Sequence, residues 1–246
     1  HNTGRRQRQM CIRDSYKDIN EILSSNEIQL FKQLQGIISA INKDTNLTRL
    51  IEGDDYWISQ VYDSIWPFYL NPNKTFNGKK FVDIGSGCGF PGLAYAITHP
   101  NSEVYLVDSS RKKTEALKQI IDALNLSNKI FVINERIEKI AHNDLYRNTF
   151  DIGTTRAVGS PSTVSEYILP MLKRSGIGLL YCGKWNKKDE FKIKNTLNIL
   201  KGSITEIKKN QLPKGKGERN IIFIKPEQNC PDFYPRAIGK PSKYPL

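Results

Sequence analysis

The chain has 246 residues, of which 38% are hydrophobic and 10% aromatic, a composition typical of a soluble globular protein with a full core. It contains no apolar run of 18 residues and no charged-then-apolar start, so we expect neither a membrane span nor a secretion signal. The four cysteines are scattered, without a CxxC pair or a histidine at metal-ligand spacing. This pattern predicts a reducing, cytoplasmic location and no bound metal.

The net charge of +12 is unevenly distributed along the chain. Residues 16–183 hold 18 Lys and Arg against 18 Asp and Glu, residues 184–246 hold 15 against 6, and residues 1–15 hold the remaining +3. A basic surface confined to the last quarter suits a polyanionic substrate. A solvated, lysine-rich surface that aids solubility is an open alternative.

The sequence predicts an N-terminal helical segment after a short leader. Residues 1–15 carry four arginines without hydrophobic periodicity, and we expect a non-native or disordered leader there. Apolar residues at helical spacing from Tyr16 to Ile41, interrupted at residues 24–26, predict two helices. A further helix is expected from Asp54 and should stop at Pro67, before a turn-rich linker at residues 71–78. Residues 16–75 therefore form the predicted N-terminal helical segment.

Strands and helices then alternate. Strands are expected at 80–84, 103–108, 130–134, 150–155 and 176–182, and helices at 91–98, 111–124, from Arg136, at 161–172 and at 187–200. Repeated βα units predict a mostly parallel α/β sheet of the Rossmann-like, class I methyltransferase type over residues 76–225. Extended runs at 203–211 and 219–225 predict a C-terminal hairpin that adds an antiparallel edge strand. The basic, Pro-rich tail, residues 226–246, should lie extended over the surface.

The most informative motif follows the first of these strands. Asp83 ends the strand, and a glycine loop follows with glycines at alternate positions, Gly85, Gly87 and Gly89. Glycines let the backbone turn tightly and approach a ligand closely. Nineteen residues after Gly89 the next strand ends in Asp108, which is placed to accept hydrogen bonds from ribose hydroxyls. The pattern predicts a nucleoside-cofactor site.

Two cofactors fit the loop spacing. Gly87-x-Gly89-x-x-Gly92 matches the dinucleotide fingerprint and leaves an NAD(P)-dependent oxidoreductase as an alternative. However, Asp83 precedes the loop, where a carboxylate would repel a pyrophosphate and suit the ammonium group of S-adenosyl-L-methionine. The loop therefore favours S-adenosyl-L-methionine.

Several further segments carry a family resemblance. They are Asn46-Leu47-Thr48, Asp63-Ser64, the glycine loop through Pro91-Gly92, Val107-Asp108-Ser109, Glu135-Arg136-Ile137-Glu138, Thr155-Arg156-Ala157, Gly217-Glu218-Arg219-Asn220 and Tyr234-Pro235-Arg236. In this order and spacing the chain resembles the bacterial small-subunit (16S) ribosomal RNA guanine-N7 methyltransferases, known as RsmG or glucose-inhibited division protein B, over about residues 20–246. Many relatives carry Arg-His where this chain has Ser59-Gln60, so no role of that histidine is carried over.

The resemblance implies roles for particular residues. Gly85 and Phe90 would line the methionine end of the cofactor, Asp108 would hold the ribose, and the backbone at Ile137 and Glu138 would meet the adenine. The full predicted cofactor set is Asp83, Gly85, Gly87, Gly89, Phe90, Asp108, Ile137, Glu138 and Arg156. Arg156, at the tip of the fourth strand, would face the methyl-transfer centre, with Arg219 as the second catalytic candidate. A surface ion pair is the alternative role for either arginine.

The chemistry agrees with what the sequence contains. Guanine N7 has an exposed lone pair and no proton, so its methylation requires positioning rather than a general base. The fourth strand ends in Thr154-Thr155-Arg156-Ala157, not in the Asp/Asn-Pro-Pro-Tyr motif of exocyclic-amine methyltransferases. An arginine can donate to guanine O6. We interpret Cys182 as a small core residue rather than a nucleophile.

The expected partner is 16S ribosomal RNA or a small-subunit assembly particle, bound by a monomer. The candidate RNA contacts are Lys184, Lys214, Lys216, Arg219 and Arg236. Besides the oxidoreductase, the alternative is a non-catalytic RNA-binding protein with the same fold.

Overall fold

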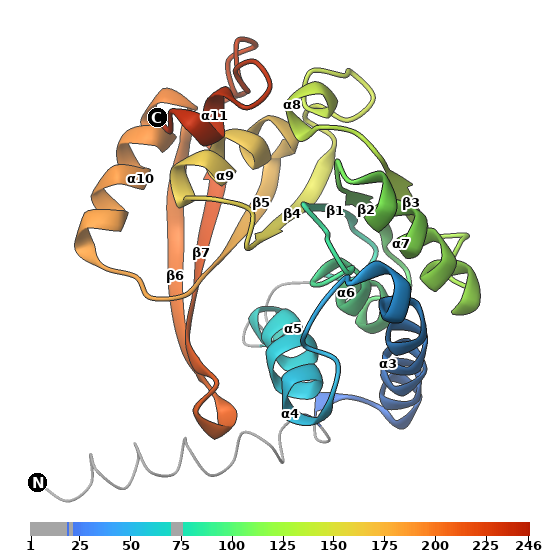
Figure 1. Cartoon of the computed structure of the whole chain (residues 1–246). Coiled ribbons are helices and arrows are strands. Elements are labelled where there is room, and N and C mark those ends of the chain that lie inside the picture. The colour runs from blue at the N-terminus through green and yellow to red at the C-terminus, as the bar shows by residue number, and fades with distance from the viewer. Residues whose placement is uncertain (1–18, 20–21, 70–75) are drawn as a thin grey trace, which may run out of the picture.

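The computed structural model describes residues 19, 22–69 and 76–246. The predicted leader, most of the first predicted helix, residue 70 and residues 71–75 of the predicted linker lie outside these residues. The chain forms a seven-stranded sheet in the order β3-β2-β1-β4-β5-β7-β6, enclosed between helical layers (Figure 1). Its strands are β1 (Lys80–Ile84), β2 (Glu103–Val107), β3 (Ile130–Ile133), β4 (Phe150–Arg156), β5 (Leu172–Cys182), β6 (Gly202–Leu212) and β7 (Gly217–Pro226).

The first five strands are parallel, and β7 is antiparallel to both of its neighbours. The sequence-based expectation placed the antiparallel strand at the sheet edge, which is wrong in this detail. The crossover through α10 (Lys187–Ile199) carries the chain one strand position beyond β5, so β6 takes the edge and β7 returns into the gap. Since β6 runs in the same direction as β5, the tip of the hairpin lies at the carboxyl edge of the sheet.

Helices cover both faces, and side chains alternate between them because successive strand residues point to opposite sides. In β1, Phe81 packs in one hydrophobic cluster and Val82 in the other. The Phe81 side is covered by α3 (Ser25–Thr45), α5 (Asp63–Tyr69), α6 (Gly92–Thr98) and α7 (Arg111–Ala123). The opposite face packs against α8 (Ile137–Ile140), α9 (Pro161–Ile168), the short turn Leu169–Met171 and α10.

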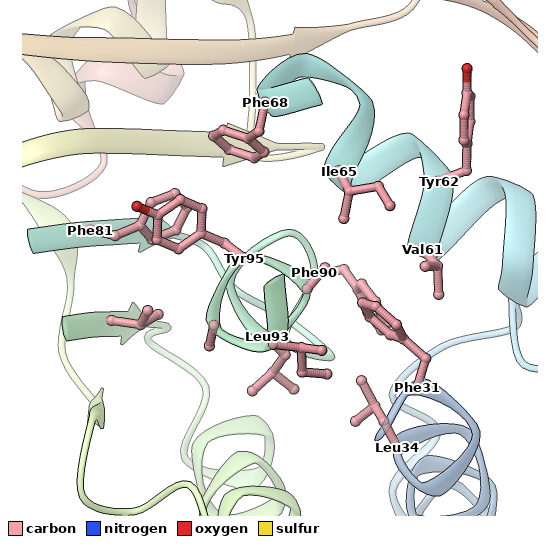
Figure 2. Packing of buried hydrophobic residues seen from close by; sticks show 14 of the residues in the cluster. Phe31, Leu34, Val61, Tyr62, Ile65, Phe68, Phe81, Phe90, Leu93 and Tyr95 are labelled. Atoms are coloured by element: carbon pink, nitrogen blue, oxygen red, sulfur yellow. The ribbon is translucent and has the colours of Figure 1, made fainter. Parts of the chain in front are cut away.

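The N-terminal helices share a core with the sheet. Ser24 caps α3 through a reciprocal capping box with Glu27. Figure 2 shows Phe31 and Leu34 of α3 packed near Phe90 and Leu93, which join the glycine loop to α6. The N-terminal segment therefore packs directly behind the loop that carries the predicted site.

The next helical segment has an irregular centre. A short helix, α4 (Gly53–Tyr56), leads into a π-helical turn, Trp57–Tyr62, and then into α5. Pro67 lies inside α5, so the expectation that the helix stops there is wrong, although it ends two residues later. A π-helical turn shifts the register of the residues that follow and is frequent at functional sites.

The C-terminal tail folds back instead of lying extended. It forms turns and a final helix, α11 (Lys240–Lys243), beside α9 (Figure 1). The Arg147 guanidinium donates to the carbonyls of Ala141, Cys230, Pro231 and Tyr234 at 2.8–3.1 Å. These bonds pair the two terminal nitrogens of a nearly buried guanidinium and hold the tail in place, which no local pattern of the tail sequence indicated.

Candidate active site

The glycine loop leaves β1 with a backbone that only glycine tolerates at two positions. Gly85 has φ +74°, and a Cβ there would lie 2.5 Å from Val158 Cγ2. Gly89 has φ +97°, and a Cβ would lie 2.3 Å from Leu93 Cδ1. Both positions combine positive φ with close packing, so side chains are excluded for two independent reasons. The loop is thereby compressed against α6 and opens towards the carboxyl edge of the sheet.

Asp83 lies beneath this loop with 1% of its surface exposed. Its Oδ2 accepts the backbone N–H of Gly92 at 3.0 Å, and its Oδ1 accepts the hydroxyl of Thr154 at 3.0 Å. Burial outweighs these hydrogen bonds and raises the pKa of the Asp83 carboxyl to about 6. Asp83 fixes the loop to β4 and α6. Neither Asp83 nor Gly89 lines the cavities described below.

Asp108 closes the first cavity. Its Oδ2 accepts the N–H of Gly87 and its Oδ1 that of Ser110, both at 2.9 Å, so the carboxylate ties the end of β2 to the loop. A cavity of about 420 Å³ lies beside it and is lined by four of the predicted cofactor residues, Gly85, Asp108, Ile137 and Glu138. The apolar side chain of Ile137, the carboxylate of Asp108 and the backbone at Gly85 meet at the carboxyl edge of the sheet and form a wall suited to a nucleoside.

A second cavity of about 460 Å³ continues from the first, sharing Gly85, Lys113 and Ala157. Its walls include the predicted cofactor residues Gly87, Phe90 and Arg156 and the second catalytic candidate, Arg219. We call it the transfer cavity. A third cavity of about 710 Å³ lies at β2 and β3 and is lined by none of the predicted site residues.

Both arginines converge on one carboxylate in the transfer cavity. Asp63 Oδ2 lies 3.1 Å from Arg219 Nε and 3.6 Å from Arg156 Nη1. Arg156 also donates to the carbonyl of Ser59 at 3.2 Å and lies over the Phe90 ring, 5.9 Å from its centroid. The site therefore joins β4, β7, the glycine loop and the N-terminal segment.

Gln60, in the π-helical turn, also lines the transfer cavity. Its Oε1 accepts a hydrogen bond from Arg156 Nη2, and its Nε2 lies 3.1 Å from Thr48 Oγ1 and 3.4 Å from Cys88 Sγ. Gln60 stands where the family resemblance led us to expect a histidine. Sequence reasoning assigned it no role, and the departure from the family pattern was the only available signal.

The tail supplies a wall of the first cavity that sequence reasoning missed, through Gly239, Ser242 and Lys243. The side chain of Glu138 connects this wall to the sheet, because its Oε1 accepts the N–H of Gly239 at 2.9 Å and the hydroxyl of Tyr167 at 3.3 Å. No periodicity or spacing in the tail indicated this contact.

The predicted RNA-contacting residues occupy different places. Lys184 is exposed just after β5. Lys214 and Lys216, at the hairpin tip, pair with Asp54 and Asp55 of α4, with Nζ–Oδ1 distances of 2.8 and 2.6 Å. Arg236 is held inside the protein by Glu166 of α9. Within the described residues the structure therefore brings Arg219 to the transfer cavity and leaves the other four outside both cavities.

Comparison with known proteins identifies the family. The family model described as rRNA small subunit methyltransferase G (GidB) matches residues 27–222. The chain belongs to this family. A Ribosomal RNA small subunit methyltransferase G from Prochlorococcus marinus subsp. pastoris (strain CCMP1986) is 62% identical over 93% of this chain and 96% of its own length. That of P. marinus strain MIT 9312 is 61% identical over 94% and 97%.

Solved structures show the same fold at low identity. An O-methyltransferase from Bacillus cereus, in complex with SAH, covers 86% of this chain and 96% of its own, with a TM-score of 0.58 and 13% identity. The cofactor-bound Rv0187 from MTB covers 88% and 96%, with a TM-score of 0.58 and 12% identity.

As a member of this family, the chain is a methyltransferase and its cofactor is S-adenosyl-L-methionine. Two adjoining cavities at the carboxyl edge of the sheet, one beside Asp108 and one beside the glycine loop, fit a ligand with a nucleoside end and an amino-acid end. The assignment favours the methyltransferase interpretation over the oxidoreductase alternative. In the part of the chain that is described, no helix is long and apolar enough to cross a membrane, and no group of three His, Cys, Asp or Glu is placed to hold a metal ion.

Proposed function

We propose that this protein transfers the methyl group of S-adenosyl-L-methionine to N7 of a guanine in 16S ribosomal RNA. The names of the relatives support the substrate, and the basic last quarter of the chain supports a polyanionic partner. We further propose that it acts in the cytoplasm as a monomer, on naked RNA or on a small-subunit assembly particle. Sedimentation of the purified protein would test the monomeric state.

One observation carries the choice of N7. Among the described residues that line the transfer cavity, the only carboxylate next to the arginines is Asp63, and both guanidiniums bind it. None of the described residues that line this cavity is a histidine. An acceptor that must lose a proton would need a free base here, whereas N7 attacks through a lone pair and needs only to be held in line with the methyl group.

The chemistry of Cys182 argues against another acceptor. Cys182 lines the transfer cavity. Burial raises the pKa of its thiol to about 12, so the thiol stays protonated at neutral pH. A thiol in this state is a poor nucleophile for attack on a pyrimidine ring. The cavity therefore favours direct transfer without a covalent enzyme intermediate.

The arginines have donors left for the base. Arg156 and Arg219 each use two of five N–H donors in hydrogen bonds to described residues. Either guanidinium would donate to guanine O6 from one side, which leaves N7 open to the methyl group. Asp108 would bind the ribose, and the backbone at Ile137 and Glu138 would meet the adenine.

Mass-spectrometric mapping of ribosomal RNA tests the proposal. RNA from cells lacking the gene should lose one 7-methylguanosine from the 16S molecule, and the wild-type gene should restore it. Complementation with Arg156→Ala should fail although the variant protein accumulates. Unchanged 7-methylguanosine in the deletion strain, or full restoration by a variant that cannot bind the cofactor, would support the non-catalytic RNA-binding alternative.

A further inference from the structure

We propose that Asp63 is the positioning residue of the methyl-transfer centre, holding Arg156 and Arg219 at the distance from each other that the guanine requires. This inference deepens the proposed function and rests on it. Asp63 belongs to the N-terminal segment, while the arginines come from the ends of β4 and β7. The carboxylate is thus the point where three separate parts of the chain meet.

The two arginines share one oxygen of this carboxylate. Asp63 Oδ2 is 3.1 Å from Arg219 Nε and 3.6 Å from Arg156 Nη1. Without a negative charge between them, two guanidiniums that approach the same point would repel each other and turn towards solvent. Opposite charge at the midpoint lets both point into one cavity.

Because the Asp63 carboxylate is buried, its charge is stabilised mainly by the two arginines. The Asp63 side chain is 3% exposed, and its Oδ1 is buried without a hydrogen-bond partner among the described residues. A buried carboxylate is costly unless it is paired, so the arginines are its main compensation. This mutual dependence predicts strong energetic coupling between residue 63 and residues 156 and 219.

The surrounding backbone is arranged to fix the carboxylate. Asp63 is the first residue of α5, directly after the π-helical turn. The hydroxyl of Ser64 donates to the carbonyl of Gln60 at 2.5 Å, and the buried hydroxyl of Tyr181 donates to the carbonyl of Ser64 at 2.7 Å. These bonds tie the start of α5 to β5, so the position of Asp63 is set by the sheet itself.

This arrangement gives the N-terminal segment a second role besides covering the sheet. In the π-helical turn, the carbonyl of Ser59 and the side chain of Gln60 accept hydrogen bonds from Arg156. Asp63, directly after the turn, pairs with both arginines. The segment therefore orients the arginines from its own wall of the transfer cavity, to which Ser59, Gln60 and Asp63 contribute. A misplacement of about 1 Å at a reacting group is enough to cost about 10²-fold in rate.

A double-mutant cycle tests the proposal. Asp63→Asn should lower the single-turnover rate of methyl transfer to 16S RNA at least tenfold, while the cofactor Kd measured by calorimetry changes less than threefold. In an Arg156→Ala, Arg219→Ala background, Asp63→Asn should change the residual rate less than threefold. Asp151→Asn is the matched control: Asp151 lies near the other end of β4 and pairs with Lys173 at 2.9 Å, and the rate should stay within twofold.

Total methyl transfer is counted whichever atom accepts it, so an error about N7 does not affect this result. Independent, multiplicative rate losses for Asp63→Asn and the arginine variants would overturn the proposal. If Asp63→Asn does not fold, Asp63→Glu keeps the charge but displaces it by one methylene, and it should still lower the rate with the cofactor Kd retained. A full wild-type rate in Asp63→Glu would overturn the proposal.

Urea unfolding of the same proteins provides a readout without substrate. The loss of stability from Asp63→Asn should largely disappear when both arginines are absent, since the coupled charges are then removed together. If wild-type protein transfers no methyl group to ribosomal RNA, the proposed function fails, and this unfolding cycle still decides on Asp63. Additive losses of stability would contradict the shared anchor.

Discussion

The guanidinium of Arg236, in the C-terminal tail, and the carboxylate of Glu166, in α9, form a buried pair with an Nη2–Oε2 distance of 2.8 Å. Arg236 Nε also donates to both carboxylate oxygens, at 3.0 and 3.2 Å, and Glu166 is fully buried. Three residues later, Gly239 contacts Glu138, and the chain enters the wall of the first cavity. The pair therefore connects the stability of the tail to the shape of the cofactor site.

Arg236→Leu should destabilise the protein by about 3–5 kcal/mol, because it leaves Glu166 buried without its partner. The cofactor Kd should rise as well, since the tail would no longer close the cavity. Thermal unfolding and calorimetry measure the two effects. The control is Lys225→Ala, which removes an exposed pair with Glu227 and should cost less than about 1 kcal/mol. A weakened RNA affinity with an unchanged cofactor Kd would instead favour the predicted RNA contact of Arg236.

Asp108→Ala should weaken binding of S-adenosyl-L-methionine by about 1.5–3 kcal/mol, the range for hydrogen bonds to a charged group. Asp108→Asn retains an accepting oxygen for the loop amides and should lose less. Calorimetry with S-adenosyl-L-methionine and with NAD measures both. Micromolar binding of NAD to the wild-type protein would revive the oxidoreductase alternative.

Arg156→Ala should fold normally and lose turnover far more than cofactor affinity, because its proposed role is to orient the guanine against the methyl group. Arg156→Lys should restore activity only in part, since an ammonium group cannot reproduce a planar fork of donors. Single-turnover rates and cofactor Kd values separate these effects. Wild-type turnover in Arg156→Ala would show that this arginine is structural only.

Neutralising Lys214 and Lys216 together should flatten the dependence of log RNA affinity on log salt concentration by about one to one and a half units, at about 0.7 for each single-strand phosphate contact. The measurement is RNA affinity as a function of salt concentration. Guanine discrimination should survive, because phosphate contacts position without specifying.

The structure supplies a matched control for this variant. Asp54→Asn with Asp55→Asn removes the two carboxylates that pair with these lysines and should strengthen RNA binding, because RNA phosphates then no longer compete with Asp54 and Asp55 for the lysine charges. A full salt slope in the lysine variant, together with unchanged affinity in the aspartate variant, would place the RNA elsewhere.

Asp83 should make stability depend on pH in the direction opposite to a normal salt-bridged carboxylate. Its pKa is raised in the folded protein from 3.8 to about 6, so the folded state binds the proton more tightly than the unfolded state. Relative to Asp83→Asn, wild-type stability should therefore fall as pH rises from about 4 to about 6, by up to about 3 kcal/mol. Urea unfolding across this range measures the difference. A difference that stays constant or grows with pH would contradict the raised pKa.

Much of the local chemistry could be predicted from the amino-acid sequence. The order of strands and helices, the Asp83 glycine loop and the Asp108 position follow from periodicity and from residues whose conformational preferences act within a few positions. Gly85 and Gly89 illustrate this, because positive φ at a strand–helix turn is a local requirement that glycine alone meets easily. The family motifs similarly indicated Arg156 and Arg219 before their surroundings were known.

Which distant groups meet could be seen only in the folded chain. Asp63 binds arginines 93 and 156 positions later in the chain, and the tail closes a cavity that begins at β1. The insertion of β7 between β5 and β6 was decided in the same way, by a crossover that leaves a free strand position. Such contacts depend on packing between elements and on the pairing of buried charges. Neither leaves a periodic signal along the sequence, because the partners are separated by loops whose path is set only when the core forms.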